Sequence, residues 1–259
     1  MTEPEVIFTL DQRVATLTLN RPAALNAMTD SMVEQILAGV EQARDGAAVL
    51  LVRAEGRGFS AGRDLGGAKP GEEDGGEVLA STFNPMVRAV ADLTIPTIAA
   101  VQGACLGTGL GLALACDVIL AADTAKFGSP FGKIGAVLDS GGHKAFVDRL
   151  GPAVAMDLIY SGRFLSGTEA AAAGLVSRAI PADQLDEEAR MYASTLAAGP
   201  TLAFAESKAL VRELSDSGLS LDESLDKEAG AQSRSSRTAD YVEGFTAFLE
   251  RRTPTFRGE

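Results

Sequence analysis

Two small-residue turns constrain this 259-residue chain more than any other feature. Residues 58–65 read Gly-Phe-Ser-Ala-Gly-Arg-Asp-Leu, and residues 102–117 read Gln-Gly-Ala-Cys-Leu-Gly-Thr-Gly-Leu-Gly-Leu-Ala-Leu-Ala-Cys-Asp. Each turn follows a short apolar stretch that is typical of a strand. Because glycine leaves the backbone bare, N–H groups in such turns can contact a ligand directly. Two N–H groups that point at one spot form an oxyanion hole. The sequence therefore predicts strands that bring two turns to a common site.

The composition excludes several classes of protein. The net charge is −12, whereas binding to nucleic acid needs a basic face, so we expect no nucleic-acid partner. No apolar run reaches the roughly 18 residues that span a membrane, and the acidic N-terminus lacks the apolar segment of a secretory signal. We therefore expect a cytoplasmic protein without membrane contact. Cys105 and Cys116 lie among small apolar residues without metal-ligand spacing, which predicts two buried free thiols and no metal site.

The apolar pattern predicts an α/β fold. Alternation over 6–10 and 14–19 indicates a β-hairpin. The remaining expected strands are 48–54, 97–101, 118–121, 125–127 and 175–180. The expected helices are 31–40, then 78–92, the later part of 103–115 and most of the chain after 140. Thr29, Asp30 and Ser31 are all capping types before the first helix, and Ser31 with Glu34 fits a capping box. Repeated strand–strand–helix units favour a stacked ββα spiral. A Rossmann sheet is disfavoured, because Gly107-x-Gly109-x-Gly111 lacks the G-x-G-x-x-G spacing.

Two segments are expected outside this core. Residues 66–77 are rich in glycine and acidic residues, so they predict a surface loop, either an inert insertion or a flap beside a ligand pocket. After a core over 1–199, residues 200–259 form a second predicted unit with helices near 201–215, 220–235 and 238–251. Their apolar faces are large for a small helical region, which predicts packing against a neighbouring subunit.

Together, in this order and at this spacing, the two turns resemble those of the crotonase superfamily, the enoyl-CoA hydratases and isomerases. The resemblance implies a crotonase-type ββα spiral with a C-terminal trimerisation region, in a homotrimer or a hexamer. It also implies an acyl-CoA substrate, with coenzyme A as part of that substrate and no separate cofactor. The N–H groups of Ala61 and Gly109 would hold the thioester oxygen as it becomes an enolate. Gly109 would gain from the helix that it opens, whose N-terminus carries about half a positive charge.

The resemblance further implies which residues contact coenzyme A and the acyl group. Arg21 or Arg63 would reach phosphates, although a solvated arginine is the alternative for both. Phe248 and Arg251 resemble residues of a C-terminal helix that contact CoA, often across a subunit boundary, and core packing is the alternative for Phe248. The remaining expected CoA contacts are Ala23, Leu25, Ala61, Gly62, Asp64 and Leu65, and the expected acyl-pocket residues are Leu106, Gly111, Phe131, Val137 and Leu138.

The carboxylates separate one reaction from another. Hydratases of the superfamily carry one catalytic glutamate in the glycine-rich helix and one after a Phe-Gly-x-Pro turn, and these positions are Gly111 and Phe131 here. Hydration needs one group that takes a proton and one that gives it, so the sequence disfavours hydration. Asp139 remains, and the 1,2-epoxyphenylacetyl-CoA isomerase branch resembles this chain in carrying an aspartate there. A lone carboxylate in an apolar pocket suits proton transfer between two carbons.

Asp139 also has alternative roles. An aspartate before a helix is often its N-cap, although Ser140 could cap this helix instead. Apolar neighbours would raise the pKa of Asp139, and the helix N-terminus would lower it. His143, the only histidine, is expected to be structural and partly exposed.

We therefore predict an isomerase that shifts an enoyl-CoA double bond from Δ3 to Δ2, or converts a ring epoxide to an oxepin, with Asp139 as acid and base. Three alternatives remain open. The first is an ordinary enoyl-CoA hydratase, and the second is a dehalogenase-like enzyme that uses Asp139 as a nucleophile but would need a Trp that this chain lacks. The third is a non-catalytic acyl-CoA-binding protein.

Overall fold

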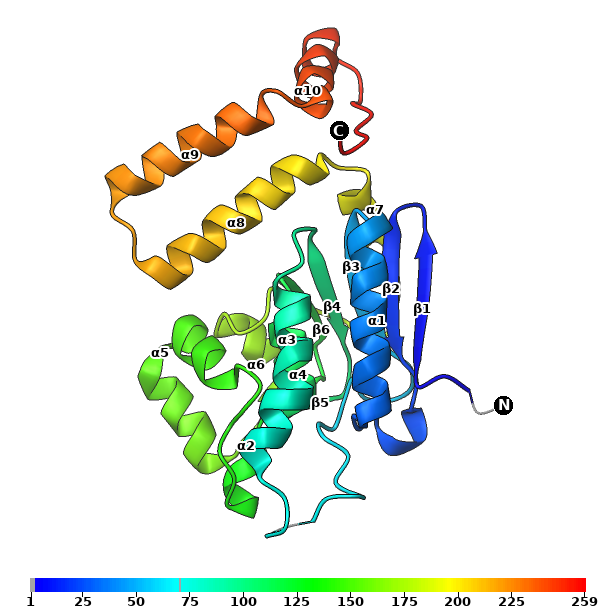
Figure 1. Cartoon of the computed structure of the whole chain (residues 1–259), viewed down its shortest axis with the longest axis vertical. Helices are drawn as coiled ribbons and strands as arrows, with labels where there is room; N and C mark the ends of the chain where they lie inside the picture. Colours follow the sequence, from blue (N-terminus) through cyan, green and yellow to red (C-terminus); the bar gives the residue numbers. More distant parts are fainter. Residues whose placement is uncertain (1–2, 70) are drawn as a thin grey trace.

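Two β-sheets form the core of the protein (Figure 1). The computed structural model describes residues 3–69 and 71–259. The larger sheet has the strand order β1 (Val6–Asp11), β2 (Val14–Leu19), β3 (Val49–Ala54), β4 (Thr97–Val101), β6 (Val118–Ala122) and β9 (Arg178–Ile180). The smaller sheet joins β5 (Ala104–Leu106), β7 (Lys126–Gly128) and β8 (Leu165–Ser166). Strands β1 and β2 form the predicted antiparallel hairpin, and the other pairs of the larger sheet are parallel.

From β4 to β7, successive strands alternate between the two sheets. β4 and β6 pair in the larger sheet, whereas β5 and β7, which follow them, pair in the smaller one. Ser60 lies beyond β3 and makes a parallel bridge with Cys105 of β5, so the 58–65 turn extends the smaller sheet. The strand–strand–helix units that follow the β1–β2 hairpin thus add to both sheets, and turns that follow equivalent strands meet at one edge. The predicted ββα spiral is confirmed.

Helices cover both sheets. They are α1 (Asp30–Gly46), α2 (Gly75–Val78), α3 (Asn84–Ala91), α4 (Thr108–Leu114), α5 (Gly142–Ser161), α6 (Gly167–Ala172) and α7 (Leu185–Ala197), with a π-helical turn η2 (Leu79–Phe83) and the 3-10 turns η1 (Pro22–Ala24) and η3 (Pro130–Ile134). Every residue of β4 and α4 is buried, because both lie between other layers of the fold. Cys105 and Cys116 are buried free thiols, as predicted, and burial raises the pKa of Cys116 to about 12.

Three local details differ from the sequence expectation. Thr29, not Ser31, caps α1, and its hydroxyl accepts a hydrogen bond from the Met32 amide. Helix α5 begins after Gly141, which caps it without any side chain, so Ser140 is not the cap. The 66–77 loop is shorter than expected, because α2 already begins at Gly75. In each case the deciding factor is the backbone conformation of one residue, which composition does not reveal.

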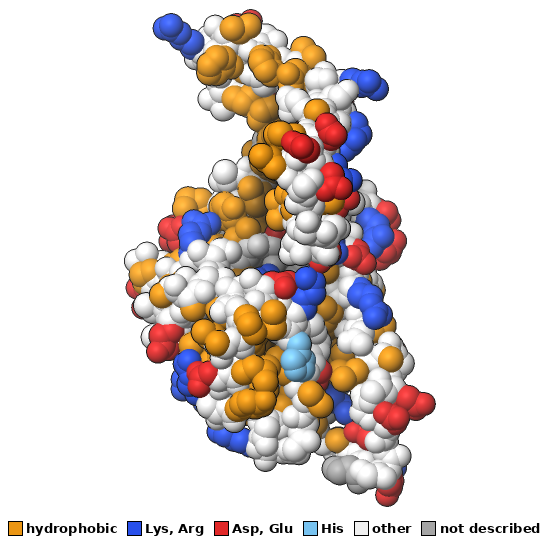
Figure 2. Space-filling model, turned by 90° about the vertical axis from the view of Figure 1, so that its left-hand side faces the viewer, with side chains coloured by type: hydrophobic (Ala, Val, Ile, Leu, Met, Phe, Trp, Pro, Cys, Tyr) orange, Lys and Arg blue, Asp and Glu red, His pale blue; other side chains and the backbone are white. Residues whose placement is uncertain are grey.

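The C-terminal region projects from the core as a helical arm formed by α8 (Thr201–Ser217), α9 (Leu221–Ser235) and α10 (Ala239–Glu250) (Figure 1). Lys208 anchors α8 to the core through Asp117, with an Nζ–Oδ2 distance of 2.7 Å, and through the carbonyl of Ile95. Apolar side chains are exposed along the arm, as the upper part of Figure 2 shows, and they include Leu221, Leu225, Val242, Phe245, Phe248 and Leu249. Across residues 3–69 and 71–259, none of the helices combines the length and the apolar character that crossing a bilayer requires.

Candidate active site

The two glycine-rich turns touch through their backbones at Gly62 and Gly107. A Cβ atom on Gly107 would lie 3.7 Å from the Cα of Gly62, and one on Gly62 would lie 3.1 Å from the carbonyl oxygen of Leu106. Both glycines have positive φ, +96° and +52°, which residues with a side chain rarely adopt. Arg63 and Thr108 are the residues that follow these two glycines, so their amides come directly after the point of contact.

The amide of Ala61 is not free to bind a ligand. It donates a hydrogen bond to the carbonyl oxygen of Leu25, with an N–O distance of 2.9 Å. The neighbouring amides are also used, since Ser60 donates to Ala104 and Gly62 donates to the Ser60 hydroxyl. The prediction that Ala61 is an oxyanion donor therefore does not hold.

In this turn, the backbone amide of Arg63 is available to bind a ligand. Met28 forms a parallel β-bridge with Arg63. The Met28 amide donates to the carbonyl oxygen of Gly62 at 2.8 Å, and the Met28 carbonyl oxygen accepts from the Asp64 amide at 2.9 Å. In such a bridge the N–H of the intervening residue points away from the bridging strand. Within the described part of the chain, no acceptor lies within hydrogen-bonding distance of the Arg63 N–H. This amide is thus the first candidate oxyanion donor.

Helix α4 offers candidates for the second oxyanion donor. Its first internal hydrogen bond runs from Gly111 N to Gly107 O at 3.0 Å, so the amides of Thr108, Gly109 and Leu110 are left without a helical partner. A Cβ on Gly109 would lie 2.4 Å from the Cβ of Ser60, so Gly109 also permits close packing of the two turns. Gly109 stays a candidate donor, and Thr108, next to the contact between the turns, is a candidate that the sequence analysis missed.

Asp139 lies half-buried in the turn before α5. Its Oδ1 atom is buried, and no donor among residues 3–69 and 71–259 forms a hydrogen bond with it. Gly141, not Asp139, is the N-cap of α5, so the carboxylate is not used for capping. Burial raises the pKa of the Asp139 carboxyl, and the nearby Ser140 hydroxyl and His143 oppose this shift only in part. A carboxylate of this kind is a good proton acceptor.

Ser140 fills the space beside Gly111. A Cβ on Gly111 would lie 2.3 Å from the Cβ of Ser140 and 2.5 Å from its carbonyl oxygen. Both contacts are far shorter than ordinary van der Waals distances of about 3.5–4.0 Å. Position 111 therefore cannot carry a side chain unless the turn that holds Asp139 moves.

The other residues that were predicted to line the acyl pocket differ in how far they are buried. Phe131 lies over the first turn of α4, since a Cβ on Gly107 would come within 3.1 Å of its ring. Leu138 is buried and packs on Gly142, and Leu106 is half-buried at the end of β5. Val137 is 73 % exposed within one chain, so its predicted place in the acyl pocket stays a prediction.

The predicted CoA-binding segments, 21–25 and 61–65, lie side by side. The Ala61–Leu25 hydrogen bond and an ion pair between Arg21 and Asp64, 3.0 Å long, join them. Arg63 makes a bidentate pair with Glu73 of the 66–74 loop, at 2.9 and 3.0 Å. Both arginines are thus engaged with carboxylates rather than free in solvent, so a phosphate would compete with an internal partner.

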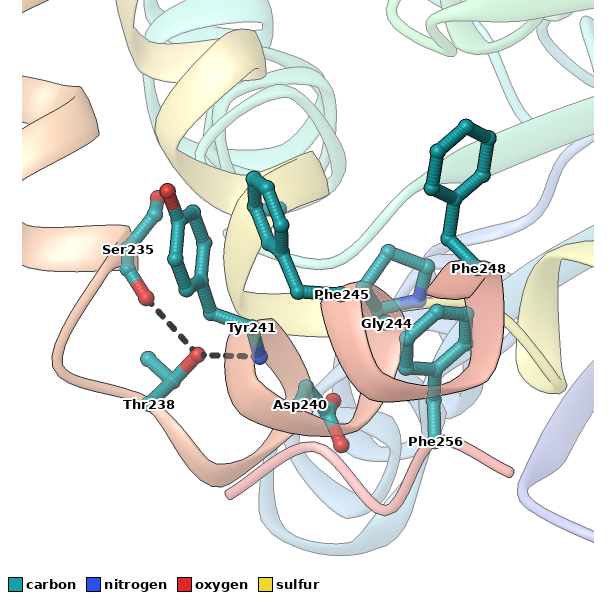
Figure 3. Close-up of a pocket in the computed structure, with 10 residues that line it drawn as sticks. Ser235, Thr238, Asp240, Tyr241, Gly244, Phe245, Phe248 and Phe256 are labelled. Carbon is teal, nitrogen blue, oxygen red and sulfur yellow. Dashed lines mark hydrogen bonds between the residues drawn. The ribbon is translucent and has the colours of Figure 1, made fainter. Parts of the chain in front are cut away.

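Phe248 and Arg251 lie elsewhere. Helix α10 and the 66–74 loop are at opposite ends of the molecule in Figure 1, so neither residue reaches the turns within one chain. Phe248 is 79 % exposed beside an apolar pocket that also contains Tyr241, Phe245 and Phe256 (Figure 3). The rings of Tyr241 and Phe245 stack with centroids 4.6 Å apart. Core packing, the alternative considered for Phe248, is excluded by this exposure.

Comparison with known proteins gives matches along almost the whole chain. The family model for enoyl-CoA hydratase/isomerase matches residues 9–259. A 1,2-epoxyphenylacetyl-CoA isomerase of Escherichia coli is 36 % identical over 259 residues, covering 96 % of this chain and 97 % of the relative. A 2,3-dehydroadipyl-CoA hydratase of the same organism is 34 % identical over 256 residues, covering 98 % and 99 %. The crystal structure of an enoyl-CoA hydratase from Polaromonas sp. JS666 superposes with a TM-score of 0.90 at 29 % identity, covering 97 % and 99 % of the two chains.

Proposed function

Because this chain belongs to the enoyl-CoA hydratase/isomerase family, we propose that it is a cytoplasmic enoyl-CoA isomerase that moves a double bond from Δ3 to Δ2. One observation carries this choice of reaction. The space beside Gly111 is filled by Ser140, while Asp139, the residue before Ser140, has a buried carboxylate oxygen without a partner. The site therefore offers one carboxylate where hydration would use two.

The thioester oxygen would sit between the amide of Arg63 and those at the start of α4. These N–H groups stabilise the negative charge that develops on that oxygen, each by on the order of 3 kcal/mol. Asp139 removes a proton from C2, and the electron pair of the broken C–H bond moves toward the thioester oxygen to form a dienolate. The same carboxyl then returns the proton to C4, which leaves the double bond between C2 and C3. No atom is gained or lost.

The relatives' names support both this reaction and its main alternative. The isomerase relative is named for a ring epoxide, and the conversion of such an epoxide to an oxepin could use the same oxyanion donors and the same acid. The hydratase relative supports addition of water. In this chain, Gly111 and Phe131 provide no acid or base for that reaction, so we favour isomerisation.

Paired assays test the proposal. With trans-3-hexenoyl-CoA, we expect the absorbance of the conjugated enoyl thioester to appear; with crotonyl-CoA, we expect that absorbance to persist because no water is added. Hydration of crotonyl-CoA would contradict the one-carboxylate mechanism. If neither substrate reacts but calorimetry shows that both bind, the chain is an acyl-CoA-binding protein and the proposed reaction is wrong.

We also propose that the exposed apolar face of α9 and α10 packs against further copies of this chain, in a trimer or a hexamer. Support comes from the exposure of Leu221, Val242, Phe248 and Leu249 on an arm that is anchored to the core mainly through α8. Such a patch is costly to leave in water. Sedimentation equilibrium should give three or six times the monomer mass of 26.8 kDa, and a monomer that is stable at micromolar concentration would contradict this arrangement.

A further inference from the structure

Ser140 has a side chain that the fold does not use. Its backbone lies in the left-handed region, with φ at +53°, and only 4 % of the residue is exposed. Its hydroxyl has no hydrogen-bond partner within the described residues. A serine before a helix normally caps that helix, yet Gly141 occupies the cap position of α5. The protein therefore keeps a buried hydroxyl, on a strained backbone, without its usual structural benefit.

The position of Ser140 relates it to the acyl group. Its Cβ stands where a side chain at position 111 would begin. Gly111 follows Thr108 by three residues in α4, which is about 4.5 Å along the helix axis at roughly 1.5 Å per residue. Three carbon–carbon bonds of roughly 1.5 Å span a similar length. With the thioester oxygen at the start of α4, the hydroxyl would lie near C3 to C5 of the acyl chain.

The polar atoms at this point are not all used by the proposed reaction. The unpartnered Oδ1 of Asp139 is explained, because it takes and returns the proton. The hydroxyl of Ser140 is not, since it makes no hydrogen bond even with the adjacent Asp139 Oδ1 and a hydrocarbon acyl group offers it no acceptor. A buried hydroxyl without a partner opposes binding.

We propose that the Ser140 hydroxyl donates a hydrogen bond to an oxygen atom on the acyl group, near C3 to C5, and that the enzyme selects oxygen-bearing acyl-CoA thioesters. This proposal rests on the proposed function only in placing the acyl group beside Asp139. Sites built to pair with a substrate hydroxyl reject the analogue that lacks it, because their own polar groups are then left unpaired. Ser140 is thus a specificity-determining residue.

Binding of unreactive esters tests this selectivity independently of turnover. Calorimetry would compare saturated hexanoyl-CoA with its 3-, 4- and 5-hydroxy derivatives. We expect at least one hydroxy ester to bind about tenfold more tightly than hexanoyl-CoA, as one hydrogen bond allows. In Ser140→Ala this preference should disappear, and hexanoyl-CoA should bind at least as tightly as it does to the unmodified protein, because no hydroxyl is then left unpaired.

Two further variants serve as controls. Ser129→Ala removes another buried hydroxyl without a partner and should keep the preference. Ser140→Gly removes the hydroxyl while suiting the positive φ, so it provides a folded test should Ser140→Ala unfold. Equal binding of all four esters by the unmodified protein, or a preference that survives in both Ser140 variants, would overturn the proposal. Neither result bears on isomerase activity, which the hexenoyl-CoA assay measures separately.

Discussion

Replacing Gly111 by alanine tests whether Ser140 truly occupies the space of a side chain at position 111. The added methyl carbon would lie 2.3 Å from the Cβ of Ser140 and 2.5 Å from its carbonyl oxygen. Carbon atoms in contact are ordinarily about 3.5–4.0 Å apart, so α4 or the 139–140 turn must move by about 1 Å or more. Because one of the obstructing atoms belongs to the backbone, no change of rotamer relieves the overlap.

The expected loss of stability follows from two opposing contributions. Overpacking of this kind costs about 1–3 kcal/mol, and the backbone contact places Gly111→Ala near the upper limit. Alanine in a helix gains about 1 kcal/mol over glycine, so the net loss is about 2 kcal/mol. For a chain of this length, that loss lowers Tm by about 4–8 °C. Gly230→Ala is the matched control, since its Cβ would meet only the flexible end of Arg234, at 3.5 Å, and Tm should rise slightly.

Gly111→Ala should also lose activity, because the atoms that it displaces belong to the residue after Asp139. A shift of about 1 Å in a catalytic group can lower the rate about 100-fold. Thermal unfolding and the trans-3-hexenoyl-CoA assay would measure both effects in the same samples. If Gly111→Ala were as stable as Gly230→Ala and fully active, the packing argument and the one-carboxylate site built on it would both be refuted.

Three other substitutions probe the charged groups. Burial raises the pKa of Asp139 because the folded protein favours the protonated carboxyl. This preference contributes fully to stability below the ordinary carboxyl pKa of about 3.9. The contribution is lost as the pH rises through the raised pKa. Asp139→Asn should therefore increase the free energy of unfolding at pH 7, measured by urea titration. The isomerisation rate should fall about 10²–10⁴-fold. If the variant were less stable than the unmodified protein, the upward shift of the Asp139 pKa would be contradicted. Glu73→Gln breaks the partly exposed ion pair with Arg63, and it should change the free energy of unfolding by less than about 1 kcal/mol. Limited proteolysis should nevertheless cut the 66–74 loop faster than in the unmodified protein. Unchanged cleavage would show that the ion pair does not hold the loop. Lys208→Met removes the ammonium partner of Asp117, a partly exposed carboxylate that keeps its two hydrogen bonds from Thr97, so it should cost about 1 kcal/mol in urea unfolding. Unchanged stability would mean that the pair does not anchor α8.

The spacing of apolar residues along the sequence predicts most of this fold, because residues on the buried face of a helix or strand recur at the period of that element. The helix expected near 220–235 is α9, Leu221–Ser235, and the hairpin strand expected at 14–19 is β2, Val14–Leu19. Caps were harder to predict. Ser31 has a suitable side chain, but the chain enters α1 with the extended conformation at Thr29, and only the residue with that conformation can accept the Met32 amide.

In the candidate site, too, the sequence pattern predicts the segments involved, whereas the individual amides depend on the folded geometry. The sequence predicts oxyanion donors in the two turns that the structure brings into contact, yet Ala61 is two residues from the amide that is free. Which amide is free depends on the segment that bridges the turn, and Leu25 and Met28, which accept and donate those hydrogen bonds, are more than 30 residues away. A useful signal does exist in retrospect, because Arg63 and Thr108 each follow a glycine with positive φ.

The missing carboxylate at position 111 and the buried hydroxyl at position 140 are two aspects of one packing arrangement. With glycine at 111, the left-handed turn at Ser140 can approach α4 closely enough to fill the space of a side chain. A carboxylate at 111 would collide with the backbone carbonyl as well as the side chain of Ser140, so it would need a different path for the turn that carries Asp139. The geometry that leaves Asp139 as the proposed base therefore also excludes a carboxylate at position 111, and the proposed choice of one-carboxylate chemistry depends on both segments together.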